Sequence, residues 1–124
     1  MDVLEFRDYC LSLPATTECT PFDEDTLVFK VMGKMFAYAG MGNFRWFNVK
    51  CDPARAIELR EVYPEVLPGY HASKVHWNTV RTDGDLTEAF LREQIRNSYN
   101  LVVAKLPRAL KAELVNLQNI SAFD

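Results

Sequence analysis

Both histidines of the chain, and one of its two tryptophans, fall within residues 69–81. The same short stretch carries Lys74 and Asn78 beside Trp77. A buried strand rarely holds so many polar side chains, because a buried polar group without a hydrogen-bond partner costs about 1 to 3 kcal/mol. The stretch is therefore expected to be either an exposed polar edge or a binding site.

The spacing of the histidines argues against shared metal chemistry. His71 and His76 are five residues apart, which places them on opposite faces of a strand unless the backbone bends at Ala72 and Ser73. No metal or other cofactor is expected. Ser73 and Ser98 lack the turn motifs of activated serines, so no catalytic residue is predicted and enzymatic activity is not expected. An enzyme acting through either histidine would need a concave pocket around it.

Basic residues concentrate in the middle of the chain. Residues 1–29 hold seven acidic and one basic residue, whereas residues 30–81 hold four acidic and eight basic residues, within a formal net charge of −3. An acidic chain is a poor candidate for tight nonspecific nucleic-acid binding, since that affinity comes from neutralising phosphates. A local basic face remains possible, with an ordinary solvated face as the alternative. The candidate cations are Lys30, Lys34, Arg45, Lys50, Lys74 and Arg81.

Two further clusters could be binding sites, but each also has an ordinary structural interpretation. Asp23, Glu24 and Asp25 could bind a cation, but their spacing matches no EF-hand and a solvated loop is favoured. The aromatic residues of 44–47 could stack on nucleobases, although aromatics on a strand more often pack in the core.

The size and composition predict a single cytoplasmic domain over residues 1–124. The chain is 48% hydrophobic and 25% charged, as in ordinary globular proteins. No apolar run approaches the ~20 residues of a membrane span, and the first residues are acidic where a signal peptide would be basic. The three cysteines form no CxxC pair and are expected to be reduced thiols.

The first half of the chain reads as one helix followed by three strands. Apolar residues at spacings of three and four predict a helix over residues 3–13, and a polar loop follows to residue 25. Alternation from Thr26 predicts two strands joined by a two-residue turn at Gly33 and Lys34. The third strand is expected from Phe44 to Lys50.

The second half reads as a helix, two strands and two helices. Asp52 followed by Pro53 is a helix-start signature, and Asp85 with Glu88 is a near capping box for the longest helix. Strands are expected over residues 66–70 and 75–82, and a short helix after Pro107. The predicted fold is a two-layer α+β domain of order α-β-β-β-α-β-β-α-α. Its five-stranded sheet is largely antiparallel, with helices on one face and the other face partly open.

Several segments in this order resemble the MmcQ/YjbR family of double-wing DNA-binding-like proteins. They are Pro21–Phe22, Val28–Val31, Gly33–Phe36, Asn48–Pro53, Tyr63–Pro64, Pro68–His71, His76–Thr79 and Ser98–Val102. The resemblance implies a fold like that of secretion chaperones and of frataxin-like (CyaY-like) proteins. It also implies a DNA-binding role, proposed for the family from two wing-like hairpins. This chain departs from the family pattern in having Lys74 alone where a more basic stretch is usual.

The leading hypothesis is weak binding of the DNA phosphate backbone by a basic sheet face and hairpin wings. Its predicted site residues are Lys30, Lys34, Lys50 and Lys74 on phosphate, with His71, His76, Trp77 and Asn78 shaping the surface. The alternative is a module that binds a protein partner or a second copy of itself, which an exposed apolar patch would indicate. No membrane interaction is expected.

Overall fold

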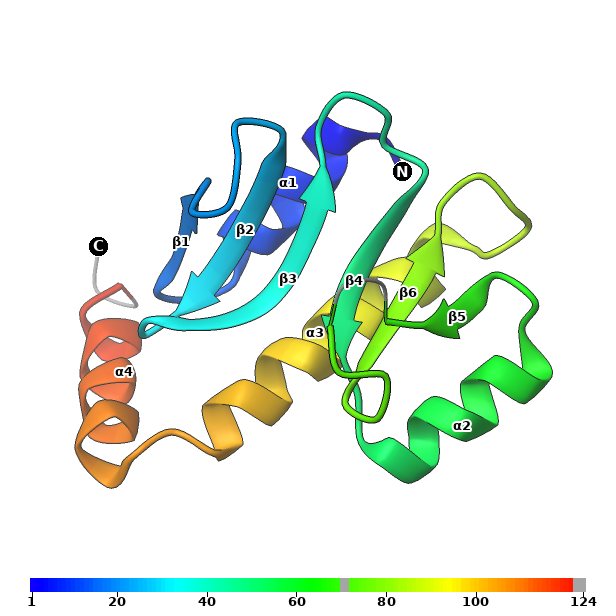
Figure 1. The fold of residues 1–124 in the computed structure, drawn as a ribbon. Coiled ribbons are helices and arrows are strands. Elements are labelled where there is room, and N and C mark those ends of the chain that lie inside the picture. Colours follow the sequence, from blue (N-terminus) through cyan, green and yellow to red (C-terminus); the bar gives the residue numbers. More distant parts are fainter. Residues whose placement is uncertain (70–71, 122–124) are drawn as a thin grey trace.

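The computed structural model describes residues 1–69 and 72–121, with side chains placed as far as residue 117. Figure 1 shows helices gathered along one side of a twisted sheet. In chain order the elements are α1 (Val3–Ser12), β1 (Thr16–Cys19), β2 (Thr26–Val31), β3 (Lys34–Gly40), β4 (Trp46–Lys50), α2 (Pro53–Val62), β5 (Val66–Pro68), β6 (Trp77–Arg81), α3 (Glu88–Ala104) and α4 (Arg108–Ser121). Among these helices, none is long and apolar enough to cross a membrane.

The sheet has six strands in the spatial order β1-β2-β3-β4-β6-β5, and every neighbouring pair is antiparallel. The predicted α+β class and antiparallel sheet are confirmed. The predicted count of five strands is wrong because β1 lies inside the segment expected to be a loop. β1 is a short edge strand with both central residues exposed, so it lacks the buried alternation that identifies a strand.

An ion pair holds β1 against the first helix. The Arg7 guanidinium donates to both carboxylate oxygens of Glu18, at 2.7 and 2.6 Å. The two-pronged geometry fixes the edge strand relative to α1. Ala15, at φ 58°, lets the chain turn sharply between the helix and the strand.

The hairpin between β2 and β3 turns one residue earlier than predicted. Met32 and Gly33 form the turn, with φ of 50° and 81°, and Lys34 is already the first residue of β3. Positive φ at both central residues is the type I′ geometry that fits the twist of a hairpin. The glycine signal located the turn, but the left-handed Met32 could not be read from the sequence because only glycine adopts that conformation without strain.

One core joins the sheet to the helices. Phe6 of α1 packs on Phe29 and Phe47 of the sheet, with ring centroids 5.4 and 5.2 Å apart. Leu91 and Ile95 bring α3 to the same sheet face, as its apolar stripe predicted. The opposite face carries a smaller cluster made by Val28, Tyr38 and Trp77.

The helix starts are partly as predicted. The Asp52 carboxylate accepts from the Arg55 N–H at 3.2 Å and Pro53 opens α2, which confirms the start signature. The longest helix instead uses Thr87 as its cap, with its hydroxyl accepting from the Phe90 N–H, so the Asp85 cap is wrong. Both threonine and aspartate are preferred N-cap residues, so the residue types at positions 85 and 87 do not by themselves tell which one caps the helix.

Candidate functional site

Three lysines from separate elements line one cavity of about 480 Å³ at the end of the sheet. They are Lys34 at the start of β3, Lys50 at the end of β4 and Lys105, which caps the C-terminus of α3. We call this space the lysine cavity. Its other lining residues are Cys51, Asp52, Pro53, Ser73, His76, Trp77, Leu101, Val102 and Leu106.

The fold explains why each lysine reaches this place. The tight turn at residues 32–33 puts Lys34 at the hairpin end, and the pairing of β4 with β6 puts Lys50 opposite Trp77. Lys105 follows the last turn of α3, where the negative end of the helix dipole favours a cation.

Ser98 of α3 fixes the end of β4 beside the cavity. Its hydroxyl accepts from the Lys50 N–H at 2.8 Å and donates to the Phe36 carbonyl at 2.6 Å. The buried serine thus bridges β3 and β4 just past the last pair of their ladder. A rigid backbone at Lys50 is what a preorganised binding residue requires.

The electrostatics of the cavity favour an anion. Loss of water around the half-buried Lys50 lowers the pKa of its ammonium, and the positive charges of Lys105 and then Lys34 lower that pKa further. The Lys50 ammonium lies 5.6 Å from the Trp77 ring centroid, in a cation–π contact. Within the described residues, none of the three lysines forms an ion pair.

The Asp52 carboxylate is the one acidic group among the residues that line the cavity, and the backbone of α2 already binds it. The lining therefore carries a surplus of positive charge. Several arginines, by contrast, are neutralised locally: Arg7, Arg55, Arg81 and Arg92 each pair with a carboxylate. A ligand in the lysine cavity would therefore meet three lysines that no carboxylate pairs within the described residues.

The structure brings four of the eight predicted site residues together at this cavity: Lys34, Lys50, His76 and Trp77. Lys30, on β2, and the exposed Lys74 do not line it. Asn78 is only 1% exposed, so the expectation that it shapes the binding surface is corrected. The prediction for His71 lies outside the described residues.

Asn78 instead takes part in a clamp from α2. The Arg60 guanidinium donates to the Asn78 side-chain oxygen at 2.8 Å and to the Trp77 carbonyl at 3.3 Å, and it also donates to the Lys74 carbonyl. The clamp holds residues 74–78, which include the His76 and Trp77 side of the lysine cavity. The Asn78 side chain, predicted to shape the binding surface, is therefore structural, because its partner Arg60 lies on a helix 18 residues away in the sequence.

Gly69 permits the close pairing of β5 with β6. Its N–H donates to the Trp77 carbonyl at 2.8 Å, and a Cβ at Gly69 would lie only 2.6 Å from the Trp77 Cβ. A side chain at residue 69 would therefore push on the backbone that carries Trp77.

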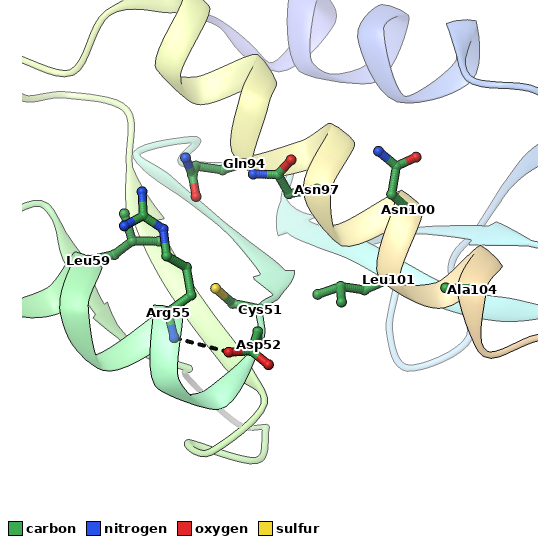
Figure 2. A pocket seen from close by; sticks show the side chains of 9 residues that line it. All are labelled: Cys51, Asp52, Arg55, Leu59, Gln94, Asn97, Asn100, Leu101 and Ala104. Atoms are coloured by element: carbon green, nitrogen blue, oxygen red, sulfur yellow. Dashed lines mark hydrogen bonds between the residues drawn. The ribbon is translucent and has the colours of Figure 1, made fainter.

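A second space lies next to the lysine cavity, between α2 and α3. It measures about 320 Å³ and shares Cys51, Asp52 and Leu101 with the lysine cavity. Figure 2 shows Cys51 and Asp52 between the two helices, with Gln94 and Asn97 of α3 facing the side of Arg55 and Leu59. We call this space the amide groove. It is lined by Cys51, Asp52, Arg55, Leu59, Gln94, Asn97, Asn100, Leu101 and Ala104.

Sequence reasoning missed Lys105 and the amide side chains of α3. Lys105 lies in the last third of the chain, where acidic and basic residues nearly balance, and only the fold brings it to Lys34 and Lys50. Gln94, Asn97 and Leu101 recur at helical spacing, which is the signal that could have marked one face of α3 as a groove wall.

The remaining clusters have structural roles. Phe47 is fully buried, and Phe44 packs on Phe6, so both belong to the core. The Asp23 carboxylate accepts from the backbone N–H groups of Asp25 and Thr26, which orders the turn before β2. Among the described residues, no group of three or more metal-ligating side chains could hold a metal ion.

A family model described as YjbR matches residues 11–101. The chain belongs to the YjbR family. The matched range contains all six strands of the sheet together with Lys34 and Lys50, and it ends before Lys105. The resemblance inferred from the ordered motifs is thereby confirmed.

Relatives within the family are similar over most of their length. The uncharacterized protein YbdF of Escherichia coli O157:H7 is 37% identical over 79% of this chain and 81% of its own. The uncharacterized protein YjbR of Escherichia coli K12 is 30% identical over 94% of this chain and all of its own. The names of these relatives assign no activity to them.

Solved structures support the same fold. The crystal structure of the Deinococcus radiodurans protein DR2400, with a DUF419 domain, is 40% identical, covers 91% of this chain and 87% of its own, and superposes with a TM-score of 0.85. A Pseudomonas syringae protein is 26% identical, covers 82% of this chain and 98% of its own, and gives a TM-score of 0.71. The α+β architecture described above is therefore that of other solved proteins.

Proposed function

We propose that this YjbR-family protein binds phosphate groups of nucleic acid in the lysine cavity. The observation that carries the proposal is the meeting of Lys34, Lys50 and Lys105 around one concave space. Ammonium groups held close together repel one another, and an anion placed among them relieves that repulsion. A phosphate is the anion of nucleic acids, and lysine is a common phosphate ligand.

The placement of Lys34 agrees with the wing-like role that the resemblance implies. Lys34 follows the β2–β3 turn and is exposed, so its ammonium can reach a backbone phosphate beside the hairpin. Lys30 and Lys74 lie outside the cavity. Their contacts with phosphate would be exposed to solvent and therefore weaker, because salt screens them. The expected contact is therefore local, with about three phosphate-neutralising groups and not a broad basic face.

The test is a fluorescence-anisotropy titration with labelled 20-nucleotide DNA, single-stranded and duplex, at about 20 mM salt where phosphate contacts are strongest. Lys34→Glu and Lys105→Glu should each weaken binding at least tenfold, because each replaces an attraction by a repulsion at the phosphate. Both residues are exposed, so the substitutions leave the core intact.

Lys111→Glu is the matched control. Lys111 is exposed on α4 and does not line the lysine cavity, yet its substitution changes the net charge by the same amount. Its effect should stay within about twofold. The proposal fails if no DNA binds at tens of micromolar protein, or if all three charge reversals weaken binding equally.

The alternative is a module that binds a protein partner, which would use an exposed apolar patch. Phe22, Met35, Tyr38, Trp46 and Ala72 help to line a cavity of about 490 Å³, and Phe22 is 67% exposed. That cavity is where a protein partner would dock, and it is separate from the lysine cavity.

A further inference from the structure

We propose that the lysine cavity and the amide groove together bind one nucleoside monophosphate unit, with its phosphate at the lysines and its base in the amide groove. The inference rests on the proposed function, since it uses the lysine cavity for the phosphate. It goes beyond the proposed function by naming the ligand class. The ligand is a nucleotide whose base is unpaired, because a paired base cannot enter the groove.

The first support is that the two spaces are adjacent. They share Cys51, Asp52 and Leu101, and measure about 480 and 320 Å³. Each volume lies within the range of pockets that enclose small organic ligands, of roughly 300 to 1,000 Å³. A phosphate alone would fill only part of the lysine cavity.

The second support is the separation of charge along this space. The lysines stand at one end, while the other end carries the neutral amides of Gln94, Asn97 and Asn100. The cation there, Arg55, is paired with Glu58 at 3.2 Å. A ligand that suits both ends has an anionic group and an uncharged polar body.

The third support is the chemistry of the amide groove itself. Amide side chains offer both a donor and an acceptor, which is the combination that reads a base edge. Leu59, Leu101 and Ala104 supply apolar surface beside them, against which the face of a base can pack. Figure 2 shows Leu101 directed toward Cys51, at the junction of the two spaces.

The fourth support is the position of Asp52 at that junction. A sugar joins base to phosphate, and its hydroxyls would lie where the two spaces meet. The Asp52 carboxylate uses oxygen Oδ2 to accept from the Arg55 N–H, and a carboxylate can accept several further hydrogen bonds. A sugar hydroxyl is a suitable donor to it.

The test compares adenosine monophosphate with inorganic phosphate and adenosine by calorimetry. Adenosine monophosphate should bind at least tenfold more tightly than phosphate. Asn97→Ala should remove most of that advantage and leave phosphate affinity unchanged, because Asn97 lines only the amide groove. Asn116→Ala, at an exposed asparagine of α4, is the matched control and should change neither affinity.

Protection of the Cys51 thiol gives an independent readout. Cys51 lines both spaces, whereas Cys19 lies on β1 and lines neither. Adenosine monophosphate should slow alkylation of Cys51 and leave the rate at Cys19 unchanged. A decamer of deoxyadenosine and an abasic decamer of equal charge extend the comparison to strand-borne nucleotides.

The outcomes separate this inference from the proposed function. If DNA binds through the lysines but adenosine monophosphate binds no better than phosphate, and the abasic decamer matches the adenine decamer, the inference is wrong and the proposed function holds. If adenosine monophosphate binds with the expected pattern while neither DNA binds, the ligand is a free nucleotide and the nucleic-acid proposal is wrong. Absence of all binding overturns both.

Discussion

Lys50 makes several contacts that bear on the proposed site. Its backbone is fixed by Ser98, its ammonium lies over Trp77, and two further ammonium groups line the same cavity. Burial and those like charges both favour the neutral form, so its pKa is lowered from the ordinary value for lysine. A half-buried lysine of this kind is a candidate ligand contact, since groups with a perturbed pKa gather at functional sites.

Removing one neighbouring charge should raise the pKa of Lys50. In Lys105→Gln the loss of the like charge removes one cause of the lowering, while desolvation and Lys34 remain, so the pKa should rise but stay below the ordinary lysine value. NMR titration of the Lys50 side-chain carbon resonances measures it. Lys111→Gln should leave the titration unchanged, and an unchanged Lys50 pKa in Lys105→Gln would show that the charges do not interact.

The same coupling predicts how binding depends on pH. An anion stabilises the charged form of Lys50, so the bound state holds its proton more tightly than the free state. Affinity for phosphate should be full below the lowered pKa of Lys50 and decline as the pH rises through it. Lys50→Gln should bind more weakly and flatten that part of the profile.

At the scale of elements, α2 positions the loop that forms one wall of the lysine cavity. Arg60 donates to Asn78, Trp77 and Lys74, so one guanidinium ties the helix to residues 74–78. Arg60→Ala removes the donor to the Asn78 oxygen and the Lys74 carbonyl, while the Trp77 carbonyl keeps the Gly69 N–H, and should lower the free energy of unfolding by about 1 to 3 kcal/mol. Urea denaturation followed by tryptophan fluorescence measures the change.

Arg55→Ala on the same helix is the control for that experiment. Arg55 is exposed and, among the described residues, its guanidinium pairs with the exposed Glu58, an arrangement whose loss should change the free energy of unfolding by about 0.5 kcal/mol or less. Arg60→Ala should also weaken DNA binding, because His76 and Trp77 lose their support. Equal stability losses in the two variants would show that the clamp contributes nothing beyond a surface charge.

The elements that were predicted well from the sequence are those that a local residue pattern determines. The apolar stripe of α3, the Asp52–Pro53 start of α2 and the glycine of the β2–β3 turn act through neighbours close in the chain. β1 was missed because its stability comes from pairing with β2 and from Arg7, which no local pattern reveals.

The candidate site was predictable only in part, for the same reason. Lys34, Lys50 and Trp77 come from the basic middle segment and its aromatic stretch, which the sequence marked. Lys105 and Asn97 reach the site through the packing of α3 across the sheet, which composition cannot show. Asn78 was misassigned because a polar residue in a predicted site and a polar residue held by a distant arginine look alike in sequence.

At the scale of the whole molecule, charge limits how nucleic acid can bind. The net charge is −3, and the first 29 residues hold seven of the acidic groups. A broad interface would bring these carboxylates close to phosphates, where like charges repel. Binding confined to the lysine cavity avoids that repulsion, so few counterions should be released.

The salt dependence of DNA binding therefore distinguishes a local site from a basic face. With three lysines on a single strand, the slope of log K against log salt should be about −2, since each neutralised phosphate contributes about −0.7. Lys105→Gln should reduce the magnitude of the slope by about 0.7, and Lys111→Gln should leave it unchanged. Anisotropy titrations from about 20 to 200 mM salt measure these slopes. A slope near −5 would mean that many cations beyond Lys34, Lys50 and Lys105 contact phosphate, and the lysine cavity would then be only one part of a wider interface.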